Sequence, residues 1–189
     1  MKLTEELIQE HAKIGIVLNI MNRISEDIKT QKVFYADDVE DILKFIFVYW
    51  DKCHCKKEEK VLFPALISEG VIEKNDLLSI LVQEHIIGKN NLKEISSCIE
   101  NCKIGNPFSC EKLAASLSTY VSMMQVHMEN EEKIFFSLAD KELSKNKQDH
   151  VLEQFETIDK RLVKLKVYEQ FQTKLKQLEL KYINEPVRV

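Results

Sequence analysis

Apolar residues recur at steps of three and four along four long stretches of the chain, as they do on one face of an α-helix. The first stretch follows Thr4, which we expect to be the N-cap of a helix with Glu5 and Glu6 in its first turn. Its apolar row is Leu7, His11, Ile14, Leu18 and Met21. A histidine therefore occupies a core position of the first helix.

The second stretch is expected to open near Asp37 or Asp38 and to end before Gly70. Pro64 lies inside it, and we expect a kink or an early end there because proline lacks the N–H group that a helix needs. The row of this helix is Leu43, Phe47, Trp50, His54, Glu58, Val61 and Leu62.

The third stretch is expected to begin near Asn75 and to stop near Gly105, and the fourth follows Asn106 and Pro107. Their rows are Leu78, Leu81, His85, Gly88, Leu92, Ile95 and Ile99, and then Leu113, Leu117, Tyr120, Met124, His127, Glu131, Ile134 and Leu138. Four helices of similar length with short connections predict an all-α fold, an up-down-up-down antiparallel four-helix bundle over residues 1–142.

A fifth, highly charged stretch from about Lys145 to Tyr182 predicts an additional long amphipathic helix within residues 143–189. Its row is Val151, Phe155, Ile158, Leu162, Leu165, Tyr168, Phe171, Leu175, Leu178 and Tyr182. A stripe of this length has to be covered. It could pack on the bundle, on a second copy of the chain as a homodimer, or on a protein partner, and the spacing leaves all three open.

Composition narrows the class of protein. The chain has 189 residues, 44% of them hydrophobic, which is compatible with one compact domain and an appendage. The net charge of −4 gives no reason to expect a nucleic-acid partner. We expect no membrane partner either, because no stretch has the length of a membrane span or the character of a secretory signal. Five cysteines, an odd number, favour a cytoplasmic location.

Four of the five histidines form a doubled pattern. His11 is followed by His54-x-x-x-Glu58, and His85 is followed by His127-x-x-x-Glu131, with intervals of 43 and 42 positions between the two histidines of each half. The text around them also repeats, since LIQEH at residues 7–11 is echoed by LVQEH at residues 81–85. Two similar halves predict a pseudo-symmetric site.

Residues four apart on a helix lie on the same face, so each His-x-x-x-Glu pair presents an imidazole beside a carboxylate. Burying such groups is costly unless something pairs them, and a metal ion is the favoured partner. We expect two metals, bridged by Glu58 and Glu131, with two histidines on each. Mixed nitrogen and oxygen ligation suits iron, manganese or zinc. Asp51, three positions before His54, is expected at the surface rather than as a partner that orients His54.

The order His, His-x-x-x-Glu, His, His-x-x-x-Glu over about residues 1–140 resembles the hemerythrin-like superfamily, the HHE cation-binding group. The segment HCKKEEKVLFP at residues 54–64 is similar to its second-helix signature. The resemblance implies a non-heme di-iron centre, two iron ions with an oxo or hydroxo bridge, and makes manganese or zinc the weaker alternatives. The terminal ligands that it implies are His11, His54, His85 and His127. The bridging ligands that it implies are Glu58 and Glu131.

One departure from that family matters. Its oxygen carriers have an additional histidine one turn from the first on the third helix, and here the neighbours of His85 at that distance are Leu81 and Lys89. The spare histidine, His150, lies near the start of the fifth helix and is expected at the surface. The spacing of the last bridging acid, Glu131, also differs. Metal binding is therefore better supported than reversible oxygen carriage.

Residues beside the expected ligands form a candidate small-molecule pocket. Gly15 and Gly88, each about one turn after a histidine, would either leave room for O2, peroxide or nitric oxide, or let helices approach closely. Tyr120 and Met124 share the row of His127 and are pocket candidates as well, although core packing explains both. The neighbouring core positions are expected to be Ile14, Phe47, Trp50 and Met123.

Cys53 and Cys55 cannot both face one ion, because they lie about 200° apart around a helix. Cys55 is the candidate for a thiol relay beside the metals, although inert thiols are the default expectation. Three functions fit the site: binding or sensing of a small molecule such as O2, peroxide or O2 reduction by an enzyme, and iron storage, delivery or sensing. We favour the first, in which the protein is not an enzyme.

Overall fold

The computed structural model describes residues 3–31, 33, 35–72, 76–104, 106–163 and 167–184. Every regular element in these ranges is helical, which confirms the all-α fold class. No helix in the described part of the chain combines the length and the apolar character needed to cross a membrane.

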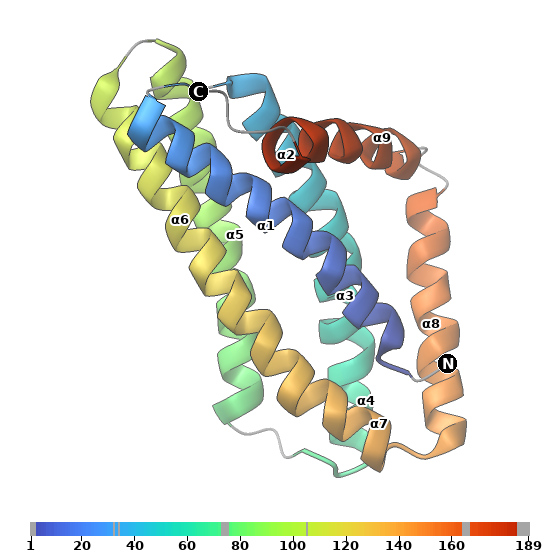
Figure 1. Cartoon of the computed structure of the whole chain (residues 1–189). Helices are drawn as coiled ribbons and strands as arrows, with labels where there is room; N and C mark the ends of the chain where they lie inside the picture. Colours follow the sequence, from blue (N-terminus) through green and yellow to red (C-terminus); the bar gives the residue numbers. More distant parts are fainter. Residues whose placement is uncertain are drawn as a thin grey trace.

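Four long helical stretches lie side by side and form the bundle (Figure 1). The helix α1 (Glu5–Gln31) packs against α6 (Pro107–Asn130), which packs against α5 (Asp76–Lys103), and α5 in turn contacts α2 (Ala36–Ile46). Contacts between α2 and α1 close the ring. In Figure 1 the chain runs along α1, returns from α2 to α4, and then repeats this path through α5 and α6.

Helix starts agree with the sequence pattern where the chain is described. The helix α1 begins at Glu5, directly after Thr4, the residue expected as its N-cap. The hydroxyl of Thr4 donates a hydrogen bond to Asp140 Oδ2 at 2.8 Å. Asn106 caps α6 by accepting a hydrogen bond from the backbone N–H of Phe108 at 3.1 Å. The third stretch was expected to start near Asn75 and to stop near Gly105, and both residues lie outside the described ranges.

The second bundle stretch is continuous but not uniformly α-helical. Its parts are α2 (Ala36–Ile46), the π-helix η1 (Phe47–His54), α3 (Cys55–Lys57), the π-helix η2 (Glu58–Leu62) and α4 (Phe63–Ser68). Of the two alternatives expected at Pro64, a kink or an early end, the early end is wrong, because α4 continues to Ser68 and so ends just before Gly70 as expected. The disturbance instead takes the form of the π-helical turn just before the proline. Such turns are common at functional sites. Here η1 ends at His54 and η2 begins at Glu58, and both residues are candidate ligands.

The prediction that Phe47 is a core residue is wrong, because 54% of its surface is exposed. Its neighbour in the predicted row, Trp50, is buried. The buried positions of this stretch are instead Ile42, Ile46, Trp50 and Cys53, so the core face includes Ile46 where the predicted row placed Phe47.

The fourth stretch shows the same change of pattern. After α6 it continues as the π-helix η3 (Glu131–Phe136) and then α7 (Ser137–Glu142). The buried apolar side chains of the bundle fall into two clusters, one containing Leu18 and Leu117 and the other Leu7 and Phe135. His11 comes between the two clusters along α1. A polar layer therefore separates two apolar ones.

The C-terminal segment folds back on the bundle as α8 (Lys145–Val163), α9 (Val167–Glu179) and the π-helix η4 (Leu180–Asn184). The two helices run in different directions in Figure 1, so the prediction of one long helix is wrong. A straight helix over residues 145–182 would measure about 57 Å, against about 42 Å for α5, and its stripe would overrun the bundle. Packing on the bundle is the alternative that the described residues adopt.

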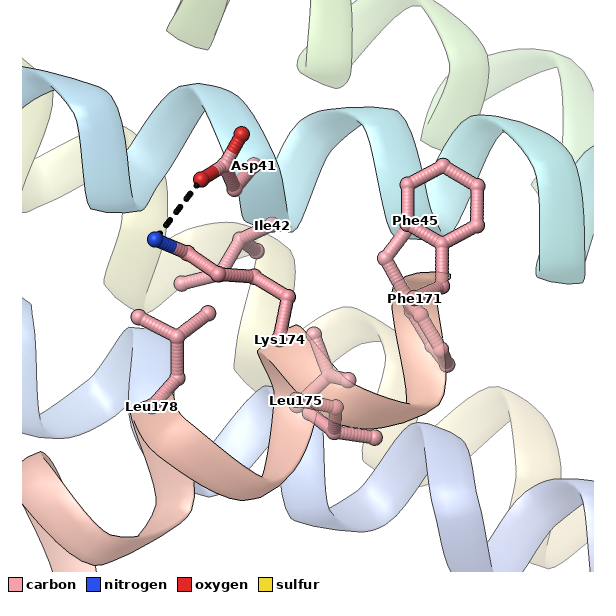
Figure 2. A pocket seen from close by; sticks show the side chains of 8 residues that line it. Asp41, Ile42, Phe45, Phe171, Lys174, Leu175 and Leu178 are labelled. Atoms are coloured by element: carbon pink, nitrogen blue, oxygen red, sulfur yellow. Dashed lines mark ion pairs between the residues drawn. The ribbon is translucent and has the colours of Figure 1, made fainter. Parts of the chain in front are cut away.

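The helix α8 buries Val151, Phe155 and Ile158 against the α3 region of the bundle. The helix α9 lies across α1 and α2, where Phe171, Leu175 and Leu178 face Ile42 and Phe45 (Figure 2). An ion pair between Lys174 and Asp41, 3.1 Å long, borders this contact. The stripe positions Leu162, Leu165 and Tyr168 lie outside the residues whose side chains are described.

Candidate metal centre

The six candidate ligands meet in the polar layer, and each of them is at most 3% exposed. Each stretch of the bundle contributes to the layer, because every predicted row places its histidine on the core face. The ligands are His11 of α1, His54 and Glu58 of the second stretch, His85 of α5, and His127 and Glu131 of the fourth stretch.

One half of the layer brings two histidines and two carboxylates together. The Nε2 atoms of His11 and His54 lie 2.9 Å apart. Glu131 Oε2 lies 3.3 Å from the Nε2 atom of His11, and Glu58 Oε1 lies 3.4 Å from that of His54. One donor atom from each of the four residues falls within 4.8 Å of all the others, which is an arrangement that could hold a metal ion.

The other half uses the opposite oxygens of the same carboxylates. Glu131 Oε1 lies 3.1 Å from His127 Nε2 and 3.5 Å from His85 Nε2. Glu58 Oε2 lies 3.4 Å from His85 Nε2. Each carboxylate thus presents one oxygen to each histidine pair, as a carboxylate that bridges two cations would.

Several of these buried atoms have no hydrogen-bond partner among the described residues. They are both carboxylate oxygens of Glu58 and of Glu131, and the Nε2 atoms of His85 and His127. Leaving buried polar atoms unpaired costs roughly 1–3 kcal/mol for each group and more for charged ones. A cation between the histidine pairs and the carboxylates would pair all of them, so the donor set fits a bound metal.

The other ring nitrogen of each histidine contacts a glutamate that the sequence analysis did not assign. The Nδ1 contacts are His11 with Glu132 at 2.8 Å, His54 with Glu10 at 2.9 Å, His85 with Glu59 at 2.9 Å, and His127 with Glu84 at 2.7 Å. Such carboxylates orient a metal-binding imidazole and leave its Nε2 atom for the ion.

The doubled sequence contained the signal for these glutamates. Glu10 and Glu84 directly precede the first histidine of each half, and Glu59 and Glu132 directly follow the glutamate ligand. Their roles escaped prediction because each contacts a histidine on another helix. Neighbouring helices, and not neighbouring residues, bring these pairs together.

The histidines and glutamates of the layer stabilise each other's charged forms. Burial lowers the pKa of His54, but the charge of Glu58 and the hydrogen bond to Glu10 outweigh it, so this pKa lies well above its ordinary value. Burial raises the pKa of Glu131, but His11 and the other histidines around the carboxylate hold it well below its ordinary value. Glu131 is therefore ionised at neutral pH, and a metal that binds here displaces protons from imidazoles.

Asp51 is partly exposed and is not the partner that orients His54, because Glu10 contacts the Nδ1 atom of His54 instead. The Asp51 side chain is 10% exposed and pairs with Lys89 at 2.8 Å and with Lys52 at 3.0 Å. Lys89 occupies one of the two positions considered for the additional histidine, and its side chain pairs with Asp51. His150 is at the surface as predicted, with 63% of its side chain exposed.

The residues proposed for a small-molecule pocket have different surroundings in the structure. A Cβ atom on Gly88 would stand 2.6 Å from Trp50 Cη2, so Gly88 allows close packing and leaves no space. Gly15 has no heavy atom within 4 Å of such a Cβ. Tyr120 and Met124 are buried in the apolar cluster beside the layer, and burial raises the pKa of the Tyr120 hydroxyl well above its ordinary value.

The two cysteines of the second stretch face different groups, as their angular separation predicted. Cys55 lies with Glu58 and His85, their donor atoms all within 4.8 Å of one another. Burial raises the pKa of the Cys55 thiol to about 11. Cys53 instead groups with Glu10 and with Asp159 of α8.

Comparison with known proteins agrees with this geometry. The model of the family described as hemerythrin HHE cation binding domain matches residues 2–139, the part of the chain that holds all six candidate ligands. No curated protein and no solved structure matches the chain. Because the match covers well over half of its length, the chain belongs to the hemerythrin HHE cation-binding family.

Proposed function

We propose that the protein holds two iron ions in this layer and binds O2, or a related small molecule such as nitric oxide or peroxide, as a binding or sensing module. The observation that carries the proposal is the split of Glu58 and Glu131, each of which presents one oxygen to each histidine pair. Such a split serves two cations better than one.

The donor set leaves room for a small ligand. Two imidazoles and one oxygen from each of two carboxylates provide four protein donors for each ion, fewer than the six that octahedral iron accepts. Iron in such a site supplies reversible redox chemistry and affinity for diatomic ligands. Because the six side chains are at most 3% exposed, the surroundings favour a small ligand.

A cytoplasmic location is part of the proposal and is supported by the five cysteines, all of which are unpaired. A second copy of the chain or a protein partner would have to use a surface other than the stripe residues that α8 and α9 already bury. The alternative function as an enzyme that reduces peroxide or O2 is favoured by Cys55, whose thiol lies beside Glu58 and His85.

The first experiment measures the metal content of the purified protein and its visible absorption, first reduced without oxygen and then after adding air and peroxide. About two irons per chain and absorption changes that reverse on removing oxygen would support the binding module. Irreversible oxidation with consumption of peroxide would favour the enzyme. Zinc, or no metal in a folded protein, would refute the di-iron proposal.

A matched pair of variants assigns the result to the bridging carboxylates. Glu131→Gln removes the charge of a buried ligand, whereas Glu129→Gln removes the same charge from an exposed residue of the same stretch that pairs only with Lys133 among the described contacts. Iron content should fall in the first variant and stay unchanged in the second.

A further inference from the structure

A buried lysine connects the candidate metal centre to α8. The side chain of Lys57 is 0% exposed, and its ammonium donates hydrogen bonds to Glu10 Oε1 at 2.6 Å and to Asp159 Oδ2 at 2.9 Å. It also pairs with Glu6 of α1. Glu10 in turn contacts His54 Nδ1 at 2.9 Å. Four side chains therefore form one unbroken chain of polar contacts from α8 to a candidate ligand.

Other contacts hold α8 at the same place. Cys53 Sγ lies 3.2 Å from Asp159 Oδ1 and 3.7 Å from Glu10 Oε1. The Lys57 ammonium also lies 5.6 Å from the centre of the buried Phe155 ring of α8. Glu10, Cys53 and Asp159 have the spacing of a metal site, but the lysine ammonium already supplies the cation there.

The second half of the chain provides an internal comparison. Its equivalents of Glu6, Cys53 and Lys57 in the repeated pattern are Ile80, Val126 and Asn130. Ile80 and Val126 are 52% and 55% exposed, so no helix within the described ranges covers that face as α8 covers the first.

The glutamates that support the histidines differ accordingly. The side chain of Glu10 is 7% exposed and is held by Lys57, whereas the side chain of Glu84, which supports His127, is 26% exposed. Docking of α8 thus adds a constraint to one histidine pair that the other pair lacks.

We propose that Lys57 and Asp159 are positioning residues that couple the docking of α8 to metal binding at the His11 and His54 half of the centre. With α8 in place, Asp159 fixes the ammonium of Lys57, the ammonium fixes Glu10, and Glu10 aims His54 Nε2 at the ion. Because coupling is reciprocal, a metal bound at this half also holds α8 on the bundle. This inference rests on the proposed metal-binding function.

The test compares Asp159→Asn with Glu156→Gln in the full-length protein. Both variants remove one negative charge from α8, but Asp159 pairs with the buried Lys57, whereas Glu156 pairs with the exposed Lys160 on the same helix. Ferrous iron is titrated without oxygen against a chromophoric chelator, and hydrogen exchange is measured over residues 150–160 with and without ferrous iron. Asp159→Glu restores the charge and serves as the rescue variant.

We expect Asp159→Asn to weaken one of two iron-binding steps by about two- to thirtyfold, while Glu156→Gln binds as the unmodified protein does. Iron should slow exchange in α8 of the unmodified protein and of the control, and not in Asp159→Asn. A residue with only a structural role would weaken both steps together and would not respond to the conservative rescue.

Equal affinity in the two variants, or exchange in α8 that iron does not change, would overturn the coupling while iron binding itself stays intact. An unmodified protein that binds no ferrous iron would overturn the proposed function, and the coupling with it. Should Asp159→Asn not fold, the exchange of the unmodified protein with and without iron decides the question alone.

Discussion

The indole ring of Trp50 lies against the backbone of Gly88, where an added Cβ atom would stand 2.6 Å from Cη2 and 3.3 Å from Cζ2. The same ring meets the imidazole of His85 edge-on, with 5.9 Å between ring centres. The glycine therefore permits a contact that packs a large side chain beside a candidate ligand.

Gly88→Ala should destabilise the protein, because the rigid indole has to shift within a packed core. Overpacking costs about 1–3 kcal/mol, and the better helix propensity of alanine returns about 1 kcal/mol, so we expect a net loss of about 1 kcal/mol. Gly15→Ala is the control, since its Cβ meets no atom within 4 Å, and it should gain up to about 1 kcal/mol. Urea unfolding of both variants measures the difference, and a stabilised Gly88→Ala protein would contradict the packing argument.

Glu84→Gln should weaken metal binding, because the amide holds the His127 ring less firmly than the carboxylate that contacts Nδ1 at 2.7 Å. Loss of such an outer partner typically reduces metal affinity about 10- to 100-fold. Glu94→Gln, an exposed position on the same helix that pairs with Lys112, should bind as before. Iron affinity measured by competition with a chelator distinguishes the two, and equal affinities would mean that Glu84 does not orient the ligand.

Removal of the metal should lower the stability of the bundle. Among the described residues the oxygens of Glu58 and Glu131 have no hydrogen-bond partner, so a bound metal ion would be the group that pairs them. A ligand present at 100 times its dissociation constant adds about 2.7 kcal/mol to folding. Calorimetry at several iron concentrations should show an unfolding temperature that rises with free iron and falls on chelation. A transition that chelation leaves unchanged would show that the layer is stable without an ion.

Alkylation at pH 8 should modify Cys110 first, because it is the one partly exposed cysteine among five. Cys98 is 5% exposed and Cys102 is 7% exposed, and burial raises the pKa of the Cys102 thiol to about 12, so little thiolate forms there at pH 8. Cys55, at 1% exposed, should be equally slow. Mass spectrometry of the native protein tests this order, and all five thiols should react after unfolding in urea. Rapid native labelling of Cys55 would show that its surroundings open.

The chain's periodicity was enough to predict the helical class and the row on which each candidate ligand lies. His54 and Glu58, or His127 and Glu131, share a face because a helix repeats within four residues, and this geometry is local. The doubling of the pattern then indicated that the two halves share one layer. The prediction failed at Phe47, because the apolar positions of this stretch allow two neighbouring rows and the folded chain buries the one that contains Ile46.

Helical periodicity could not predict the contacts between side chains of different helices. Glu10 supports His54, and Glu59 supports His85, across helices whose packing no residue spacing specifies. An apolar stripe also does not specify the surface against which it packs, because the hydrophobic effect is not directional and many apolar surfaces can cover the stripe. The folded chain places α8 on the half that carries Lys57, where Asp159 joins Glu6 and Glu10 in pairing the buried ammonium.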